Sequence, residues 1–431
     1  MKFLAACLAT LAFSTGAAFA QSDPPLSLAA AVNEAVDHNA DVSAAMREVD
    51  VVRARRTQVA LAPLQLQPSV SVTPDVPGGL GLLATAGATV SQQWLPVGNL
   101  RAATTQADFG LAAARFAVDA TQRDVALQTA AAYFVLAGAQ ATIDIARENV
   151  GASNAFVRSA TLRARAGAIG NFEVLRATVE LRRVQTDLLR ALAAQASARI
   201  ALNTLLGRPP EVATTVIDPS LDPATIARSQ TLDAAPFAPS AALDMADDAA
   251  QAIDPQRREL AAERSAQTAR ADASRTLARP ALTVGVGFQG TRASRTGAMF
   301  VAPVLATSIT LSLLDHGTIV GAAREAEAAR AVLDARIVGR SREVRAHVAT
   351  ALADVRSGLR RSQYASHSRK AADDVLRIAL YGFRMGALGS LDVLNAKTAA
   401  ATARGDERQA ACDVAAARAR LDILLGVPLS S

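Results

Sequence analysis

The feature that most constrains this chain is an eleven-residue motif that occurs twice at a fixed separation. Gly167-Ala-Ile-Gly-Asn-Phe-Glu-Val-Leu-Arg-Ala177 and Gly386-Ala-Leu-Gly-Ser-Leu-Asp-Val-Leu-Asn-Ala396 agree at six positions and lie 219 residues apart. The same offset relates Gly98 to Gly317, and the Leu-Leu-Gly of 205–207 to that of 424–426. Because no insertion interrupts the offset, the sequence predicts one structural unit used twice.

The glycines of the motif predict how each unit turns. Glycine adopts the left-handed conformation that ends a helix and reverses the chain. We therefore expect Gly167 and Gly386 to sit in tight turns between two helices. The first unit covers 21–207 and the second 241–431, and proline-rich residues 208–240 form an irregular connector.

Residues 1–20 have the pattern of a secretory signal peptide. Lys2 precedes an apolar core, and Ala18-Phe19-Ala20 matches a cleavage site. The core is too short for the alternative, a membrane anchor. We expect Sec export without lipidation, because no cysteine stands at the cleavage point. Since the basic residues are scattered, the net charge of +6 indicates a solvated surface and no nucleic-acid partner.

The hydrophobic pattern predicts the same order of elements in both units. The first has a helix at 27–62, strands at 68–74 and 84–94, a long helix at 99–166 and a return helix at 171–206. The second has a helix at 241–278 that restarts at Pro255, strands at 280–288 and 303–313, and helices at 318–385 and 390–425. No apolar run of 18 residues follows the signal, so we expect no membrane-spanning helix.

The helix lengths predict a rod. At 1.5 Å per residue the long helices span roughly 100 Å and the return helices roughly 55 Å, so two short helices match one long one. This arrangement places the strands at one end and the glycine turns at the other. The expected fold class is mainly α, with long antiparallel helices and a small β part.

The four strands leave two interpretations open. Their alternating pattern is typical of outer-membrane barrels, but four strands cannot close one, and open edges are excluded from lipid. A chain inserted in a membrane would have to oligomerise. A soluble cap of β-hairpins on an exported helical rod or adaptor-like protein is the alternative.

Sites for catalysis or metal binding are not apparent. The four histidines show no ligand spacing, and there is no nucleophile elbow or phosphate-binding glycine loop. We therefore expect no enzyme activity, no cofactor and no metal.

The ordered motifs resemble the TolC family of outer-membrane efflux proteins. They are Leu26-Ser-Leu-Ala-Ala-Ala-Val, the proline-led strands at Pro68 and Pro280, the turn at Gly386, and both Leu-Leu-Gly ends. The resemblance covers 26–428. It implies a homotrimer in outer-membrane lipid, with a twelve-stranded barrel above a periplasmic helical tunnel. It also implies a passive exit duct for tripartite efflux or type I secretion, served by a periplasmic adaptor and an inner-membrane pump.

The same resemblance implies the site residues. Asp392 corresponds to a carboxylate ring at the periplasmic entrance, although a carboxylate beginning a helix is an equally good interpretation. Asn395 stands where relatives often carry a second acid, Leu388 stands where one has arginine, and Glu173 is the first-unit counterpart of Asp392. The adaptor-docking residues are expected at the turns: Gly167, Ala168, Ile169, Gly386, Ala387, Leu388, Gly389 and Ser390.

Overall fold

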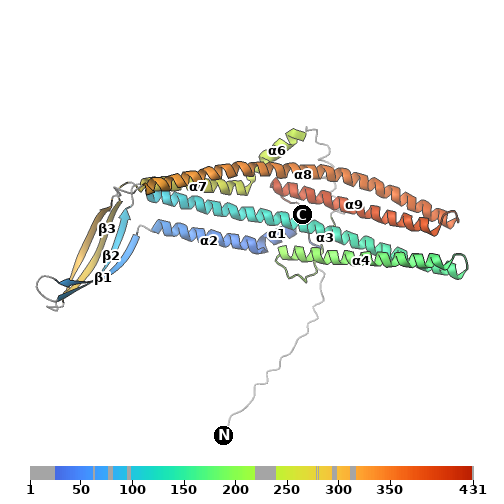
Figure 1. The fold of residues 1–431 in the computed structure, drawn as a ribbon, viewed down its shortest axis with the longest axis horizontal. Helices are drawn as coiled ribbons and strands as arrows, with labels where there is room; N and C mark the ends of the chain where they lie inside the picture. The colour runs from blue at the N-terminus through green and yellow to red at the C-terminus, as the bar shows by residue number, and fades with distance from the viewer. Residues whose placement is uncertain are drawn as a thin grey trace, which may run out of the picture.

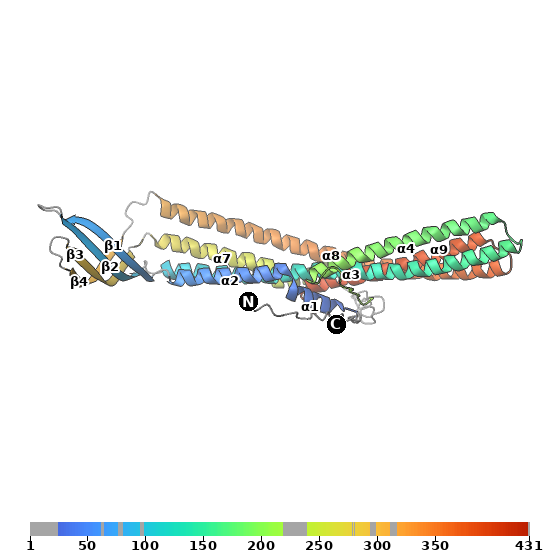
Figure 2. The same cartoon turned by 90° about the horizontal axis from the view of Figure 1, so that it is seen from below.

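The chain forms a long rod with a small β-sheet at one end and two helical turns at the other (Figures 1 and 2). The structure is a computed structural model and describes residues 25–61, 64–75, 81–94, 99–218, 239–277, 279, 281–293, 299–310 and 317–429. The predicted signal peptide and most of the 208–240 connector lie outside these ranges.

The two halves contain matching helices. The first half has α1 (Leu28–His38), α2 (Ala40–Leu61), α3 (Asn99–Arg165) and α4 (Asn171–Leu205). The second has α6 (Pro239–Ile253), α7 (Pro255–Thr276), α8 (Thr318–Arg384) and α9 (Ser390–Leu424). The long helices α3 and α8 have 67 residues each, and the return helices α4 and α9 have 35 each. The predicted ends of these four helices agree with the observed bounds to within one residue, whereas α6 begins and α7 ends two residues earlier than predicted.

The prediction of a single helix over 27–62 was wrong, because the structure has two helices there, α1 and α2. Asn39 separates α1 from α2: its Oδ1 accepts a hydrogen bond from the Asp41 N–H at 2.8 Å, and its Nδ2 donates to the Leu205 carbonyl at 3.3 Å. An asparagine that bonds the backbone two residues ahead starts a new helix. The predicted restart at Pro255 is present, with Asp254 as the N-cap of α7.

The strands pair in chain order into one antiparallel sheet, β1-β2-β3-β4. They are β1 (Leu64–Asp75), β2 (Gly81–Trp94), β3 (Ala281–Ala293) and β4 (Met299–Thr310), mostly longer than predicted. Predicted residues 311–313 lie outside the described ranges. A central β2–β3 pairing joins the hairpins of the two halves.

The register sorts the sheet into two faces. One row aligns Leu66, Val90, Val286 and Leu305, and the next aligns Gln67, Thr89, Gly287 and Val304. Strand alternation therefore collects apolar positions on one face and mostly polar or small ones on the other. Much of the apolar face is open: Val286, Phe288, Val301, Leu305 and Ile309 are 58–74 % exposed, whereas Leu282 and Val284 are half-buried.

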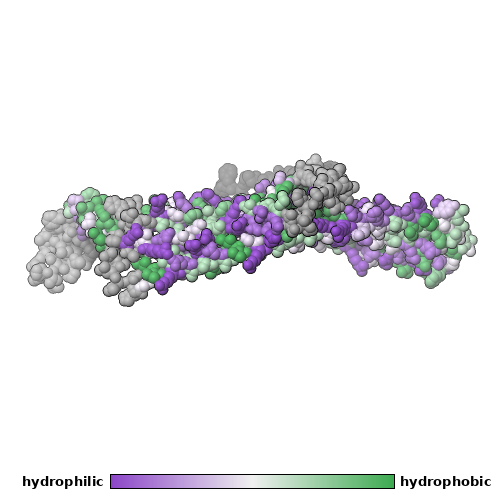
Figure 3. Space-filling model, turned by 90° about the horizontal axis from the view of Figure 1, so that it is seen from above, coloured by the Kyte–Doolittle hydropathy of each residue, from purple (hydrophilic) through white to green (hydrophobic). Residues whose placement is uncertain are grey.

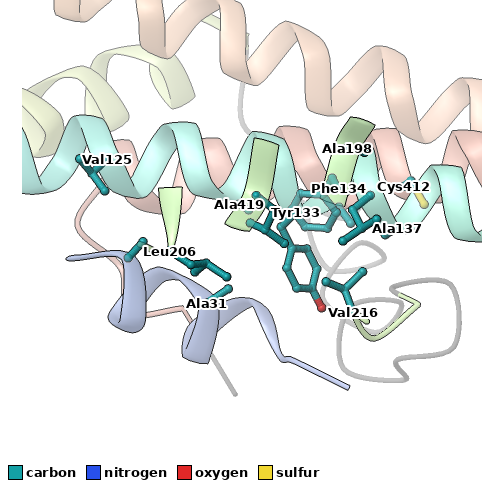
Figure 4. Close-up of a cluster of buried hydrophobic side chains, with 14 of the residues drawn as sticks. Ala31, Val125, Tyr133, Phe134, Ala137, Ala198, Leu206, Val216, Cys412 and Ala419 are labelled. Atoms are coloured by element: carbon teal, nitrogen blue, oxygen red, sulfur yellow. The ribbon is translucent and has the colours of Figure 1, made fainter. Parts of the chain in front are cut away.

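The main hydrophobic cluster lies near the middle of the rod, where α1 and the end of α4 meet α3 (Figure 4). Tyr133 and Phe134 pack edge to face with ring centroids 5.4 Å apart. The Tyr133 hydroxyl lies 3.0 Å from the Leu26 carbonyl oxygen and 3.2 Å from that of Ile217. This cluster fixes the segments that flank the first half against the long helix.

A buried ionic cluster lies at the start of α7 in the second half. The fully buried Asp254 carboxylate accepts from Arg123 Nη1 at 2.8 Å and from Arg340 Nε and Nη2 at 2.9 Å each. Arg123 Nη2 also donates to the Leu424 carbonyl at 2.6 Å. Burial alone would raise the pKa of Asp254, but the hydrogen bonds and charges of the two arginines outweigh it and hold that pKa below its usual value. The cluster thus joins α3, α7, α8 and the end of α9.

Among the described residues, α3 is the one helix long and apolar enough to cross a membrane, where the sequence predicted none. More than half of its most apolar window is buried inside the chain. Packing within the rod therefore explains its composition.

Candidate functional site

The two turns at the end of the rod opposite the sheet share one backbone geometry. Gly167 follows α3 with φ +72°, and Gly386 follows α8 with φ +74°. In each turn the glycine N–H and the next N–H bond back to the helix: Gly167 to Ala164 and Ala168 to Arg163, and Gly386 to Phe383 and Ala387 to Gly382. This is the Schellman pattern that ends a helix with glycine in the left-handed region.

A second glycine begins each return helix. Gly170 caps α4 and Gly389 caps α9, both with extended backbone. The Gly389 N–H donates to Asp392 Oδ2 at 2.9 Å. Asp392 is exposed and therefore fills the helix-starting role that the sequence offered as one of two interpretations.

Asn395 and Glu173 occupy related places. Asn395 is exposed one turn beyond Asp392 and lines a groove of about 530 Å³ between α4, α8 and α9. Glu173 is half-buried in the first turn of α4. The three predicted entrance residues therefore lie within the first two turns of α4 and α9.

The expected docking residues form the rim of the rod. Gly167, Ala168, Gly386, Ala387, Leu388 and Gly389 are exposed and Ile169 is half-buried. Ser390 begins α9, but its side chain is outside the described part. A Cβ on Gly382 would lie 2.7 Å from Leu388 Cδ1, so the glycine of α8 makes room for this leucine.

A cation–π contact that the sequence did not predict joins the two turns. The Arg163 guanidinium lies 4.5 Å from the centroid of the Phe383 ring, an arrangement that attracts a cation to the ring face. The partners stand at the ends of α3 and α8, and nothing in the local sequence pattern marks them.

A chain of ion pairs ties the helices further from the turns. Arg404 of α9 contacts Glu148 of α3 at 2.7 Å and Asp373 of α8 at 3.0 Å, and Arg369 bridges Asp373 to Glu407 at 3.1 Å and 2.6 Å. Asp373 therefore belongs to an ionic network that joins α3, α8 and α9.

Large apolar residues gather on this end of the rod, where hydrophobic colour appears in Figure 3. Phe172, Leu175 and Val179 of α4 are 71 %, 65 % and 70 % exposed, and Ile378, Tyr381 and Met385 of α8 are 64 %, 60 % and 67 % exposed. Exposed patches of this kind mark interaction surfaces. Within the described ranges, no group of three or more His, Cys, Asp or Glu could hold a metal.

Comparison with known proteins identifies the same architecture elsewhere. The family model described as "Outer membrane efflux protein" matches residues 31–208 and 248–427. No curated protein matches the chain by sequence.

Three solved structures illustrate the likeness of fold. The OprN outer-membrane channel is 20 % identical with a TM-score of 0.73, over 93 % of this chain and 89 % of that one. The outer membrane protein VceC of Vibrio cholerae is 18 % identical with a TM-score of 0.73, over 93 % and 96 %. The MtrE outer-membrane channel of Neisseria gonorrhoeae, in its open state, is 18 % identical with a TM-score of 0.74, over 93 % and 89 %.

The two family-model matches cover most of both halves, from α1 to the end of α4 and from α6 to the end of α9. The chain therefore belongs to the outer membrane efflux protein family.

Proposed function

We propose that this efflux protein is a passive exit duct, with its sheet in the outer membrane and its helical turns in the periplasm. The observation that carries the proposal is the two-faced sheet at one end of the rod. Its apolar face suits lipid and its polar face suits a water-filled lumen. An inner-membrane pump of an efflux or type I secretion system would deliver substrate through a periplasmic adaptor.

Recovery of the protein from fractionated cells tests the membrane placement. The duct predicts heat-modifiable protein in the outer-membrane fraction. A soluble periplasmic monomer would instead support the exported rod. Processing after Ala20, without lipidation, is part of the proposal, and mass spectrometry of the purified N-terminus tests it.

We further propose that three chains form the duct. The edge strands are β1 and β4, and unpaired backbone groups in lipid each cost several kcal/mol. Pairing β1 of one chain with β4 of the next would close a barrel of twelve strands. In the half of the rod that carries the glycine turns, α4 packs on α3, α3 packs on α9, and α9 packs on α8. Helices α4 and α8 therefore lie at the two outer sides. Their exposed apolar residues supply an interface there.

Charges placed on both outer helices should disrupt this trimer. Val179 and Ile378 are 70 % and 64 % exposed on α4 and α8, and an unpaired charge buried in an interface costs several kcal/mol. We expect Val179→Glu with Ile378→Glu to reduce the trimer fraction sharply in light scattering corrected for detergent. Leu162→Glu, on the equally exposed α3 position at 65 %, is the matched control. A wild-type monomer with folded strands would contradict the proposal.

The turns are the proposed adaptor-docking rim. Small residues at Gly167, Ala168, Gly386, Ala387 and Gly389 would let a partner backbone approach closely, with Ile169, Leu388 and Ser390 completing the contact surface. Duplication of the unit would present two similar turns per chain, a proposal supported by the paired family-model matches.

Gly389→Leu should abolish export while trimer assembly stays intact. Gly389 has ordinary extended backbone, and an added Cβ would meet only Asp392 Oδ2 at 3.5 Å. The substitution therefore adds bulk to the rim without backbone strain, whereas Gly386 would be strained at positive φ. Drug susceptibility and adaptor co-purification measure the effect. Gly321→Leu, at an open and exposed α8 position away from the turns, is the control, and equal export by Gly389→Leu would refute the docking proposal.

We also propose that Asp392 contributes a ring of three carboxylates at the entrance. Asn395 would add an uncharged second layer, and Glu173 would flank it from the first turn. Exposure of Asp392 beside the turn supports this role, which coexists with its bond to the Gly389 N–H.

A further inference from the structure

A cavity of about 650 Å³ lies between α2, α3, α7 and α8, in the half of the rod nearer the sheet. Much of its wall is apolar, with Ala113 and Ala117 from α3, Ala266 from α7, and Val332 and Leu333 from α8. Pockets that hold small organic ligands in proteins are commonly ~300–1,000 Å³ with mainly apolar walls. The cavity is open to solvent, and it has the volume and the wall composition of a small-molecule site.

Three of the polar side chains that line this cavity are carboxylates without partners among the described residues. Glu259, Glu263 and Gln267 stand four residues apart on α7, so they share one face of that helix. Glu48 lines the cavity from α2. Within the described part of the chain, none of the three carboxylates forms an ion pair or receives a side-chain hydrogen bond. Gln267 Oε1 is buried without a hydrogen-bond partner.

Unpaired carboxylates are unusual on the neighbouring helix surface. Along the same α7–α8 pair, Arg264 contacts Asp334 at 2.5 Å, Arg270 contacts Glu325 at 3.3 Å, and Arg275 contacts Glu327. The carboxylates of the cavity are therefore unpaired in a region where arginine partners are common. Among the described lining residues Arg336 is the one cation, against three carboxylates, so the lining carries an excess of negative charge.

Electrostatics inside the cavity favour a positively charged ligand. Burial raises the pKa of Glu259, and the nearby Glu263 carboxylate raises it further. A cation between the two carboxylates would relieve their repulsion. Gln267 Oε1 would accept a hydrogen bond from an N–H of the ligand.

We propose that this cavity binds an organic cation with an apolar body. The apolar wall would hold the body, and Glu259 and Glu263 would hold the charge. This inference does not depend on the duct proposal, because it concerns binding by the folded protein whether or not the protein conducts.

Ethidium is a suitable probe, because its fluorescence polarisation reports binding directly. We expect Glu259→Gln with Glu263→Gln to weaken ethidium binding by the intact detergent-purified protein at least tenfold. Asp37→Asn with Asp41→Asn removes the same charge from exposed positions outside the cavity and should leave the affinity unchanged.

A second variant separates binding in the cavity from attraction to a charged surface. Ala266→Phe keeps both carboxylates and fills space at the α7 wall, so it too should weaken ethidium binding at least tenfold. Circular dichroism establishes that each variant is folded. Unchanged affinity in the double glutamine variant, or in folded Ala266→Phe, would overturn the proposal.

Discussion

Asp254→Ala should lower the free energy of unfolding by about 3–5 kcal/mol, the cost of leaving buried charges without their partner. Arg123 and Arg340 would lose the carboxylate that both now contact at 2.8–2.9 Å. The N-cap of α7 would be lost as well, and a lost cap costs ~1 kcal/mol by itself. Denaturant titration followed by helical circular dichroism measures the change.

The asparagine variant separates charge from capping. Asn is as good an N-cap as Asp, so Asp254→Asn should recover only the smaller part of the loss. Asp374→Ala is the control, because Asp374 is exposed and, among the residues that the structure describes, pairs only with Arg377 one turn away. A loss no larger in Asp254→Ala than in this control would show that the buried cluster is not stabilising.

The same cluster predicts how stability responds to acid. Because the folded-state pKa of Asp254 is lowered, its stabilisation is complete above the unfolded-state pKa of about 4. The stabilisation is then lost as the pH falls from there toward the folded-state pKa. In Asp254→Asn this contribution to the acid-induced loss should be absent.

Asp392→Asn should reduce cation selectivity several-fold in planar-bilayer recordings of the purified protein. Carboxylates gathered near a common axis attract cations, and the attraction strengthens where a narrow pore limits screening. Asn keeps a side-chain oxygen that can accept the Gly389 N–H, so the substitution removes charge while preserving the helix start. Block by multivalent cations should weaken in parallel.

Asp374→Asn is again the suitable control for this experiment. Asp373→Asn is unsuitable, because Asp373 contacts Arg369 and Arg404 and its loss would disturb three helices. Unchanged selectivity in Asp392→Asn would leave this residue with its capping role alone.

Features governed by local backbone chemistry could be predicted from sequence. Gly167 and Gly386 mark their turns because only a residue tolerant of positive φ closes a Schellman turn at low cost. Pro255 marks the start of α7 because proline suits the first position of a helix. The strand alternation likewise identified the paired segments, although not their full length.

Features that depend on partners distant in sequence could not be predicted. The Arg163–Phe383 contact and the ion pairs of Asp373 join residues from different helices, and a hydrophobic pattern shows which face is buried but not which side chains meet there. The break at Asn39 was missed because neither glycine nor proline marks it. For Asp392 the pattern fixed the residue's place at the helix start but left its role at the entrance open.

The equal lengths of the paired helices fix the depth of both turns below the sheet. Since α3 and α8 each have 67 residues, their turns end level, as the Arg163–Phe383 contact requires. Deleting seven residues from α3 alone would raise one turn by about 10 Å relative to the other. Helix α3 can therefore be shortened or lengthened only together with α8, whereas the strand hairpins, whose strands already differ in length between the halves, are where insertions can be absorbed.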